Sequence, residues 1–223
     1  MTLREALRLV VITDSTLAEP RSVTEVVGAA LESGARAIQL RDKRASAREL
    51  LAQARDLRAL TGEWDALLFL NDRFDVALAS EADGVHLGPD DLPVGAVRRE
   101  APPGFLIGHS TDIPGVAAKA AAEGADYIGC GAVYPTSSKK DAGVEIGIEG
   151  LAAVAGAVEI PVVGIGGISP LRARQIAQET TAAGVAVIGA VMGAQDPGKA
   201  VRELLAPFQR RGEGRSGKDG SDG

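Results

Sequence analysis

The stretch NDRFDVALASEADGVHLGPDD, residues 71–91, decides the fold of this chain. It follows the apolar run at 67–70 and contains a second short run at 84–87. Between the two runs, residues 73–81 carry apolar side chains at helical spacing. The stretch therefore predicts a β-α-β unit in which Asp72 and Asp91 lie just past the carboxyl ends of the two strands.

Asp72 and Asp91 are the first candidate functional residues. In a parallel sheet the carboxyl ends of both strands meet at one rim, so the two carboxylates would lie side by side. Two oxygen ligands suit a Mg²⁺ ion that keeps several waters and takes its other ligands from substrate phosphates. The alternative is that each aspartate only caps a helix, as aspartate often does.

The same strand-then-helix pattern recurs along the chain. Helical stretches, bounded by turn or capping residues, separate the apolar runs. These runs stand at 9–12, 37–40, 67–70, 84–87, 105–108, 126–129, 161–165 and 184–188. Eight repeats in about 200 residues predict an α/β protein that forms a single (β/α)8 TIM barrel, and an open doubly wound sheet is the alternative.

The composition bounds the domain organisation. Of 223 residues, 45% are hydrophobic and only 3% are aromatic, which suits helices packed closely on a sheet. Residues 1–208 are expected to form the catalytic barrel. Residues 209–223 combine glycine, serine and mixed charges without an apolar side chain, so a disordered C-terminal tail is expected there.

Charge, cysteine content and the amino terminus restrict location and partners. The net charge of -6 argues against nucleic acid as a partner, and no apolar run approaches the length of a membrane span. The run at 7–12 is too short for a signal peptide, and the single cysteine, Cys130, excludes an internal disulfide. We expect a cytoplasmic protein that acts on small molecules, with the oligomeric state left open and a homodimer among the options.

In such a barrel the active site is built from the loops that follow the strands. The loop after 37–40 carries Arg41 and Lys43, and the loop after 126–129 carries Lys139. Three cations beside the two aspartates suggest a diphosphate bridged by Mg²⁺. The alternative for each of these basic residues, taken alone, is an ordinary solvated charge on the protein surface.

A second anion site is suggested by Gly166 and Gly167, which precede a predicted helix start. Their backbone N–H groups can approach a phosphate, and the helix dipole adds to the attraction. The hydroxyl groups of Thr136 and Ser138 are candidate donors to the same phosphate. The alternative for the two glycines is an ordinary tight turn.

The sequence offers no nucleophile paired with a base. Cys130 is interpreted as a buried structural thiol, and His86, inside a predicted strand, as a hydrogen-bonded core residue. His109 has no clear role. A site rich in phosphate and metal ligands but poor in acid–base groups favours chemistry driven by departure of a diphosphate.

Five motifs in this order resemble those of the thiamine-phosphate synthase family, also called thiamine monophosphate pyrophosphorylases. They are QLRDK at 39–43, NDRFDVAL at 71–78, ADGVHLGPDDL at 82–92, ADYIGCGAVYPTSSKKD at 125–141 and VVGIGGI at 162–168. The resemblance covers about residues 9 to 206. It implies a condensation of a hydroxymethylpyrimidine diphosphate with a thiazole phosphate, which gives thiamine phosphate and diphosphate.

The resemblance also implies roles for single residues. The metal ligands would be Asp72 and Asp91, with Mg²⁺ as the cofactor. Catalysis would rest on four residues that hold the pyrimidine diphosphate: Arg41, Lys43, Ser110 and Lys139. The substrate-binding residues would be Gln39, Leu40, Arg41, Asp42, Lys43, Asn71, Ser110, Thr136, Ser137, Ser138, Lys139, Gly167, Ile188 and Gly189.

Two positions depart from the family pattern. Asp112 stands where the family often has histidine, and Gly189 stands where serine is common. Loss of one neutral hydrogen bond costs only about 0.5–1.5 kcal/mol, so neither change alone implies inactivity. Three other functions stay open: a related thiazole tautomerase, a degenerate paralogue that only binds pathway phosphates, and an unrelated sugar-phosphate isomerase.

Overall fold

The computed structural model describes residues 1–136 and 144–213 of the chain. The strands are β1 Leu9–Ile12, β2 Ala37–Leu40, β3 Leu67–Asn71, β4 Gly84–Leu87, β5 Leu106–Ser110, β6 Tyr127–Cys130, β7 Val162–Ile165 and β8 Gly184–Val187. The helices are α1 Leu3–Ala6, α2 Ser15–Ala18, α3 Val23–Glu32, α4 Ala47–Gly62, α5 Phe74–Ala79, α6 Val94–Glu100, α7 Pro114–Ala122, α8 Gly147–Gly156, α9 Pro170–Glu179, α10 Gly189–Met192 and α11 Pro197–Glu213.

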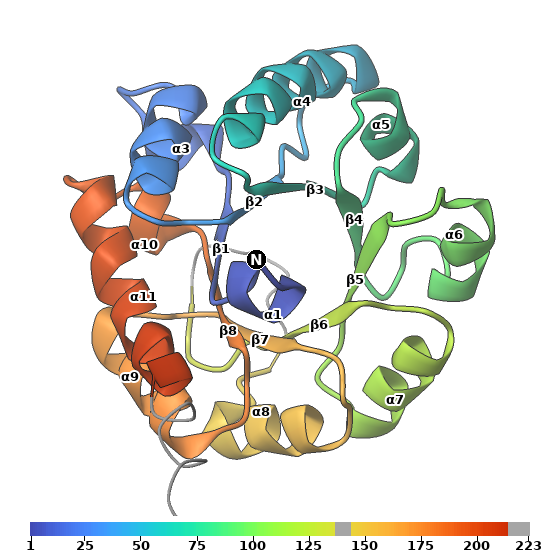
Figure 1. Ribbon diagram of the computed structural model, residues 1–223, viewed down its shortest axis with the longest axis vertical. Coiled ribbons are helices and arrows are strands. Elements are labelled where there is room, and N and C mark those ends of the chain that lie inside the picture. Colours follow the sequence, from blue (N-terminus) through green and yellow to red (C-terminus); the bar gives the residue numbers. More distant parts are fainter. Residues whose placement is uncertain (137–143, 214–223) are drawn as a thin grey trace, which may run out of the picture.

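The strands form one closed parallel barrel in chain order. Each strand pairs with the next, and β8 pairs with β1 through the register Val10 opposite Ala186. Helices surround the barrel on the outside (Figure 1). The prediction of a single (β/α)8 barrel is therefore confirmed, and the open doubly wound sheet is excluded by the β1–β8 pairing.

Local sequence signals set several helix starts. Ser22 accepts a hydrogen bond from the backbone N–H of Glu25, and the Glu25 carboxylate accepts one from the Ser22 backbone N–H in return. Ser46 and Glu49 form the same capping box at the start of α4. Such reciprocal caps satisfy donors that the first helical turn leaves unpaired.

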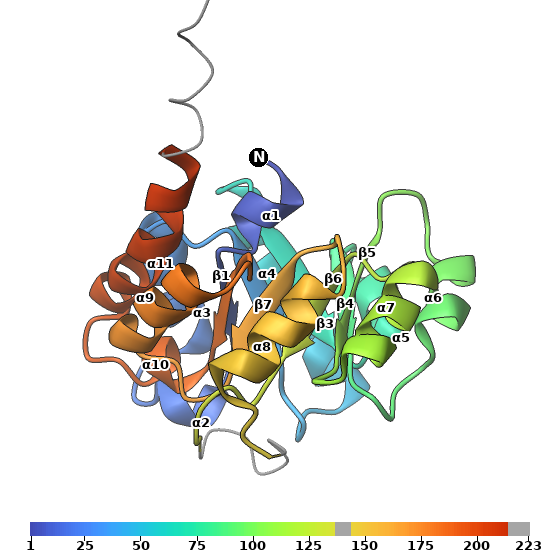
Figure 2. The ribbon, with the colours of Figure 1, turned by 90° about the horizontal axis from the view of Figure 1, so that it is seen from below.

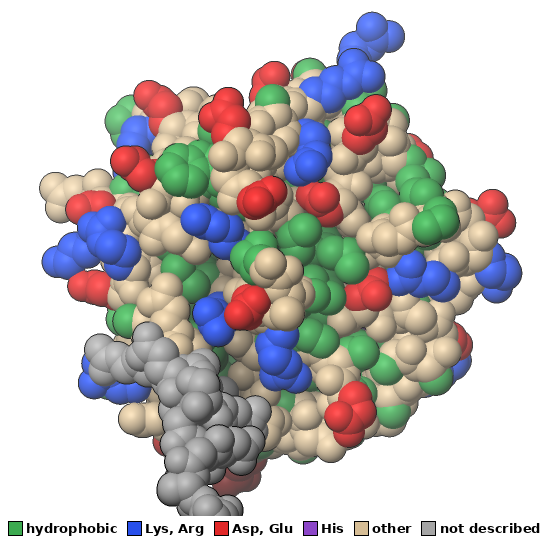
Figure 3. Space-filling model, viewed as in Figure 1, with side chains coloured by type: hydrophobic (Ala, Val, Ile, Leu, Met, Phe, Trp, Pro, Cys, Tyr) green, Lys and Arg blue, Asp and Glu red, His purple; other side chains and the backbone are tan. Residues whose placement is uncertain are grey.

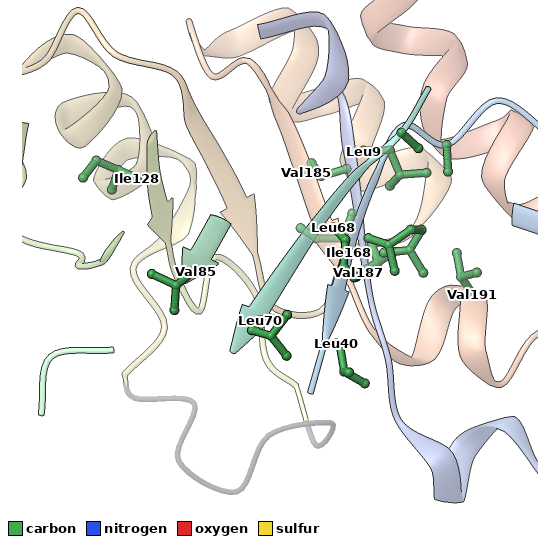
Figure 4. Packing of buried hydrophobic residues seen from close by; sticks show 14 of the residues in the cluster. Leu9, Leu40, Leu68, Leu70, Val85, Ile128, Ile168, Val185, Val187 and Val191 are labelled. Atoms are coloured by element: carbon green, nitrogen blue, oxygen red, sulfur yellow. The ribbon is translucent and has the colours of Figure 1, made fainter. Parts of the chain in front are cut away.

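Side chains alternate between the inside of the barrel and the layer beneath the helices. The inner group contains Val10, Ile12, Ala37, Phe69, Tyr127, Val163 and Ala186. Phe69 and Tyr127 meet edge to face, with ring centroids 5.2 Å apart. The intervening strand residues pack outward against the helices, as Figure 4 shows for Leu68, Leu70 and Val85. This alternation decides which positions along each strand face the interior of the barrel.

The short helix α1 covers the amino-terminal end of the barrel. It lies over the barrel axis in Figure 1, and Figure 2 shows it at the opposite end from α2 and α10. Leu7 is fully buried and Leu3 packs on the inner group. On the face seen in Figure 3, acidic and basic side chains are interspersed around this cover. The amino-terminal end is thus closed by apolar contacts.

Some predicted boundaries are wrong. Ser110 and Asn71 are the last residues of β5 and β3, whereas they were expected in the loops beyond. The last helix was predicted to end near 208, and it continues to Glu213. The remainder of the expected tail, 214–223, lies outside the described residues. Within the described part of the chain, no helix has the length and apolar character to cross a membrane.

An arginine–aspartate pair recurs at two strand starts. Asp126, just before β6, accepts hydrogen bonds from the backbone N–H of Ile107 and from Arg98, which also donates to the carbonyl of Gly124. Asp83, just before β4, has the same relation to its neighbouring strand and to Arg58. Each pair ties a strand to a preceding helix.

Replacing Asp126 with alanine should lower the free energy of unfolding by about 1–2 kcal/mol, because two charged hydrogen bonds are lost at a partly exposed site. Urea unfolding followed by circular dichroism measures this. Asp75→Ala is the control, since Asp75 is exposed and bonded only to Arg73 among the ion pairs described. Equal loss of stability in the two variants would contradict the proposed role of Asp126.

Candidate active site

A cavity of about 490 Å³ opens at the carboxyl-terminal end of the barrel. Residues from all eight strands line it, together with the loops that follow them. Of the predicted site residues, those that line the cavity are Gln39, Arg41, Asn71, Asp72, Ser110, Thr136, Gly167, Ile188 and Gly189. The structure thus gathers in one space residues that are distant in sequence.

Strand β2 shows how the alternation builds this cavity. Ala37 belongs to the inner apolar group, while Gln39 and Arg41, two and four residues on, line the cavity. Along this strand the inward side chains therefore change from apolar to polar to cationic. Leu40 points the other way and is buried in the outer apolar layer (Figure 4), so of this predicted substrate-binding residue only the backbone faces the cavity end of β2.

Arg41 is held in place from its backbone. Its N–H donates to the hydroxyl of Thr13 over 2.9 Å, and that hydroxyl donates back to the Arg41 carbonyl. In the described part of the chain, the buried Nε of Arg41 has no hydrogen-bond partner. A guanidinium in a cavity wall, with a buried donor that the described residues leave unused, is suited to an anionic ligand.

The other two residues of this loop lie outside the cavity lining. The carboxylate of Asp42 accepts hydrogen bonds from the backbone N–H groups of Arg44 and Ala45, which shapes the turn before α4. Lys43 is exposed at the rim. Asp42 therefore supports the loop that presents Arg41, and Lys43 would reach a ligand only from the rim.

Asp72 and Asp91 follow neighbouring strands, as predicted. The backbone N–H of Asp72 donates to the carbonyl of His86, and its φ of 65° lies in the left-handed region. The Asp91 carboxylate accepts a 2.7 Å hydrogen bond from the N–H of Gly88. Neither aspartate caps a helix, because the N-cap residues of α5 and α6 are Arg73 and Pro93. The capping alternative is wrong.

The donor set decides which metal these residues fit. No group of three or more His, Cys, Asp or Glu side chains able to hold a metal occurs among the described residues. Two carboxylates on adjacent strand ends, one at the cavity wall, fit a hard cation that keeps waters and binds substrate phosphates. They do not fit a cation that requires a full set of protein ligands.

A chain of hydrogen bonds crosses the base of the cavity. One ring nitrogen of His86 lies 2.8 Å from the Ser110 hydroxyl, and the other lies 2.9 Å from the Tyr127 hydroxyl. Tyr127 also bonds to Gln39, and complete burial raises the pKa of Tyr127, which therefore stays protonated. The prediction of His86 as a hydrogen-bonded buried residue is confirmed.

This network needs glycine at a neighbouring position. A Cβ on Gly108 would lie 2.2 Å from the Tyr127 ring and 2.5 Å from Nδ1 of His86. A side chain at 108 would overlap both rings, so any larger residue there would displace the network. The close approach of Gly108 therefore fixes the Ser110 hydroxyl toward the cavity through His86.

His109, Asp112 and Cys130 differ in their access to the cavity. His109 lines the wall, and burial lowers its pKa, with Glu123 and Asp91 acting in the opposite direction. Asp112 is exposed and also lines the cavity. Cys130 is fully buried, and burial raises its pKa to about 12, with a smaller contribution from Asp112. The prediction of an inert buried thiol is confirmed.

The turn after β7 and the start of α10 form the opposite wall. Gly166 and Gly167 have φ angles of 102° and 62°, which favour glycine. Helix α10 begins at Gly189, directly after β8, and was not predicted from the sequence. Backbone N–H groups from both segments therefore border the same end of the cavity, where barrels of this class commonly bind phosphate.

Three predicted residues, Ser137, Ser138 and Lys139, lie outside the described residues. Conversely, the cavity is also lined by residues that were not predicted as site residues, among them Tyr127, Ile113 and Val116. Tyr127 could have been found from the alternation of side chains along β6, because it lies two residues before Gly129 and faces the same side of the strand. Ile113 and Val116 are exposed apolar residues at the start of α7, a feature that the sequence pattern does not distinguish from core positions.

A closed barrel with charged and polar side chains in a cavity at the carboxyl ends of its strands is typical of a (β/α)8-barrel enzyme. The family model described as thiamine monophosphate synthase matches residues 9–191. The thiamine-phosphate synthase of Pyrococcus furiosus is 50% identical over 204 residues, which cover 92% of this chain and 96% of that protein. The chain belongs to the thiamine monophosphate synthase family and is a transferase of thiamine biosynthesis.

Two further comparisons agree with this assignment. The thiamine-phosphate synthase of Methanoculleus marisnigri is 47% identical over 196 residues, covering 88% of this chain and 92% of that protein. The solved thiamine phosphate pyrophosphorylase from Pyrococcus furiosus has a TM-score of 0.85 at 47% identity and covers 94% of this chain and 98% of that one. The resemblance drawn from the five motifs is confirmed.

Proposed function

We propose that the chain joins a hydroxymethylpyrimidine diphosphate to a thiazole phosphate and releases thiamine phosphate and diphosphate. With the carboxylated form of the thiazole phosphate, CO₂ is released as a third product. The observation that carries the proposal is the convergence of Arg41, Asp72 and Ser110 with Gly167 and Gly189 on one cavity. The first three suit a diphosphate with its metal, and the two glycines suit a single phosphate. Two anion-binding ends in one cavity match a reaction between two phosphorylated substrates.

The pyrimidine diphosphate occupies the side of β2, β3 and β5 in this proposal. Arg41 binds the diphosphate, with Lys43 and Lys139 approaching from the rim loops. Gln39 and Asn71 contact the pyrimidine portion, and Ser110 is held toward it by His86. Two observations support this placement. The buried Nε of Arg41 has no partner among the described residues, and a buried network holds Ser110, and preorganised donors of this kind stabilise developing charge without reorganising.

Asp72 and Asp91 would hold a Mg²⁺ ion, which when bound neutralises charge on the departing diphosphate. Asp72 borders the cavity, and Asp91 is fixed by Gly88 beside it. The thiazole phosphate lies at the other wall, against Gly167 and the Ile188–Gly189 pair. Thr136, Ser137 and Ser138 complete that phosphate site as hydroxyl donors.

The reaction proceeds by departure of diphosphate. The bond between the pyrimidine methylene carbon and the diphosphate oxygen breaks, and its electron pair leaves with the oxygen. The ring nitrogen of the thiazole then supplies its lone pair to the same carbon and becomes the positive nitrogen of thiamine. That nitrogen carries no proton to remove, so the reaction needs no general base. His86, the histidine at the base of the cavity, has both ring nitrogens hydrogen-bonded to Tyr127 and Ser110.

A diphosphate-release assay tests this function. Purified chain is mixed with both substrates and Mg²⁺, and matched reactions omit one component each. We expect diphosphate and thiamine phosphate in equal amounts, and only in the complete mixture. Isomerisation of the carboxythiazole phosphate alone would indicate a tautomerase instead. Binding of both phosphates without turnover would indicate a binding protein and contradict the proposal.

A cytoplasmic location is part of the proposal. Cys130 is a free buried thiol, which suits a reducing compartment. The proposed substrates of the enzyme are small phosphorylated molecules, which are typical of metabolism inside cells. Fractionation of cells that express the tagged chain tests the location, and recovery from an extracellular or membrane fraction would contradict it.

A further inference from the structure

Arg172, in the first turn of α9, joins the two loops that border the proposed thiazole-phosphate site. Its guanidinium donates a 2.6 Å hydrogen bond from Nη1 to the carbonyl of Gly167. The same guanidinium lies over the ring of Tyr134, with Cζ 4.4 Å from the ring centroid. Gly167 belongs to the turn after β7, and Tyr134 to the loop after β6, which leads to Thr136.

The two loops are also packed directly on one another. The backbone N–H of Tyr134 donates to the carbonyl of Gly166 over 3.2 Å. A Cβ at Gly167 would lie 2.5 Å from the Pro135 carbonyl oxygen and 3.1 Å from Nη1 of Arg172. Tyr134 is fixed a second time, because its hydroxyl donates to Oε1 of Gln175 on α9. Arg172 therefore sits at the junction where three segments meet.

The bond to Gly167 has a directional consequence. In a trans peptide the C=O and the following N–H point in opposite directions. Arg172 is not among the residues that line the cavity, whereas Gly167 and Ile168 are. Holding the Gly167 carbonyl toward Arg172 therefore turns the N–H of Ile168 to the other side of the peptide, away from Arg172.

We propose that Arg172 is a positioning residue for the second substrate. It fixes the turn at Gly167 so that backbone N–H groups face the thiazole phosphate, and it stacks on Tyr134 to hold the loop that carries Thr136 beside them. The proposal rests on the function proposed above. Its chemistry requires a planar guanidinium, since an ammonium group can neither stack in the same way nor bond in a fixed direction.

Steady-state kinetics with each substrate varied in turn test this role. For Arg172→Ala we expect the KM for thiazole phosphate to rise about tenfold, while the KM for the pyrimidine diphosphate changes less than about twofold. Arg172→Lys keeps the charge but should recover only a small part of the loss. Arg174→Ala is the matched control, because Arg174 is exposed on the same helix and should leave both KM values unchanged.

A further variant separates this inference from the proposed phosphate site. Thr136→Val removes a hydroxyl of that site at nearly constant volume and should also raise the KM for thiazole phosphate. If it raises the KM and Arg172→Ala does not, the role of Arg172 is overturned while the site stands. If both leave it unchanged, the phosphate lies elsewhere and both proposals fall. If Arg172→Lys restored the native KM for thiazole phosphate in full, the positive charge alone would be sufficient, and the positioning role would be overturned.

Discussion

Replacing Asp72 with asparagine should reduce turnover at least about 100-fold at a fixed Mg²⁺ concentration, with the fold retained. The change removes one negative charge and one metal-binding oxygen but keeps the size of the side chain. Asparagine also tolerates the left-handed backbone at this position, where φ is 65°. Excess Mg²⁺ should restore part of the activity, because a weakened site fills at higher concentration.

Alanine at the same position gives a less clear result. A residue with a Cβ and no local hydrogen bonding costs about 1–2 kcal/mol in the left-handed region, so Asp72→Ala combines metal loss with backbone strain. Asp75→Asn is the matched control, because Asp75 is exposed near Asp72 in sequence and pairs only with Arg73 among the salt bridges described. Normal turnover of Asp72→Asn without a raised Mg²⁺ requirement would contradict the metal assignment.

Replacing Arg41 should have the second large effect. For Arg41→Ala we expect turnover to fall about 100-fold, because a preorganised charge in the cavity wall is lost where the leaving diphosphate develops charge. Arg41→Lys should recover less than one tenth of the loss, since a single ammonium cannot reproduce the bidentate geometry of a guanidinium. The measurement is turnover with both substrates saturating.

The control for Arg41 must match its charge and lie near it in the chain. Arg48 is exposed on α4, outside the cavity lining, and Arg48→Ala should leave turnover unchanged. Thermal unfolding of each variant shows whether the barrel is intact. Equal activity of Arg41→Ala and the native chain would contradict the proposed binding of the diphosphate beside β2.

The repeated apolar runs predicted the barrel because each strand is buried on both sides, which leaves a continuous apolar signal. The three short helices α1, α2 and α10 were not predicted. The sequence does carry start signals for two of them, a capping box of Thr2 with Glu5 at α1 and an Asp14 N-cap at α2. A four-residue helix is too short to be stable alone, so such a signal becomes a helix only where packing supports it, as for Leu3 in α1 and Val191 in α10.

The site was predicted where a residue directly follows a strand. Asp72 could be found in this way, since it comes directly after β3, and Asp91 lies in the loop that begins where β4 ends at Leu87. The direction of a side chain needs the exact strand register, which a run of four apolar residues does not fix. Leu40 was therefore grouped with Gln39 and Arg41 although it faces the helices, and the Tyr127–His86–Ser110 network, which joins three strands, could not be foreseen.

The cover formed by α1 has a consequence for the traffic of molecules through the enzyme. Leu3 and Leu7 close the amino-terminal end of the barrel with apolar contacts, so the carboxyl-terminal mouth serves for entry and exit alike. Under the proposed reaction, both substrates therefore enter, and both products leave, at the end of the barrel where the site residues lie. Closure of one end thus makes access to the site one-sided, and the packing of Leu3 and Leu7 shields the apolar interior of the barrel from solvent at the other end.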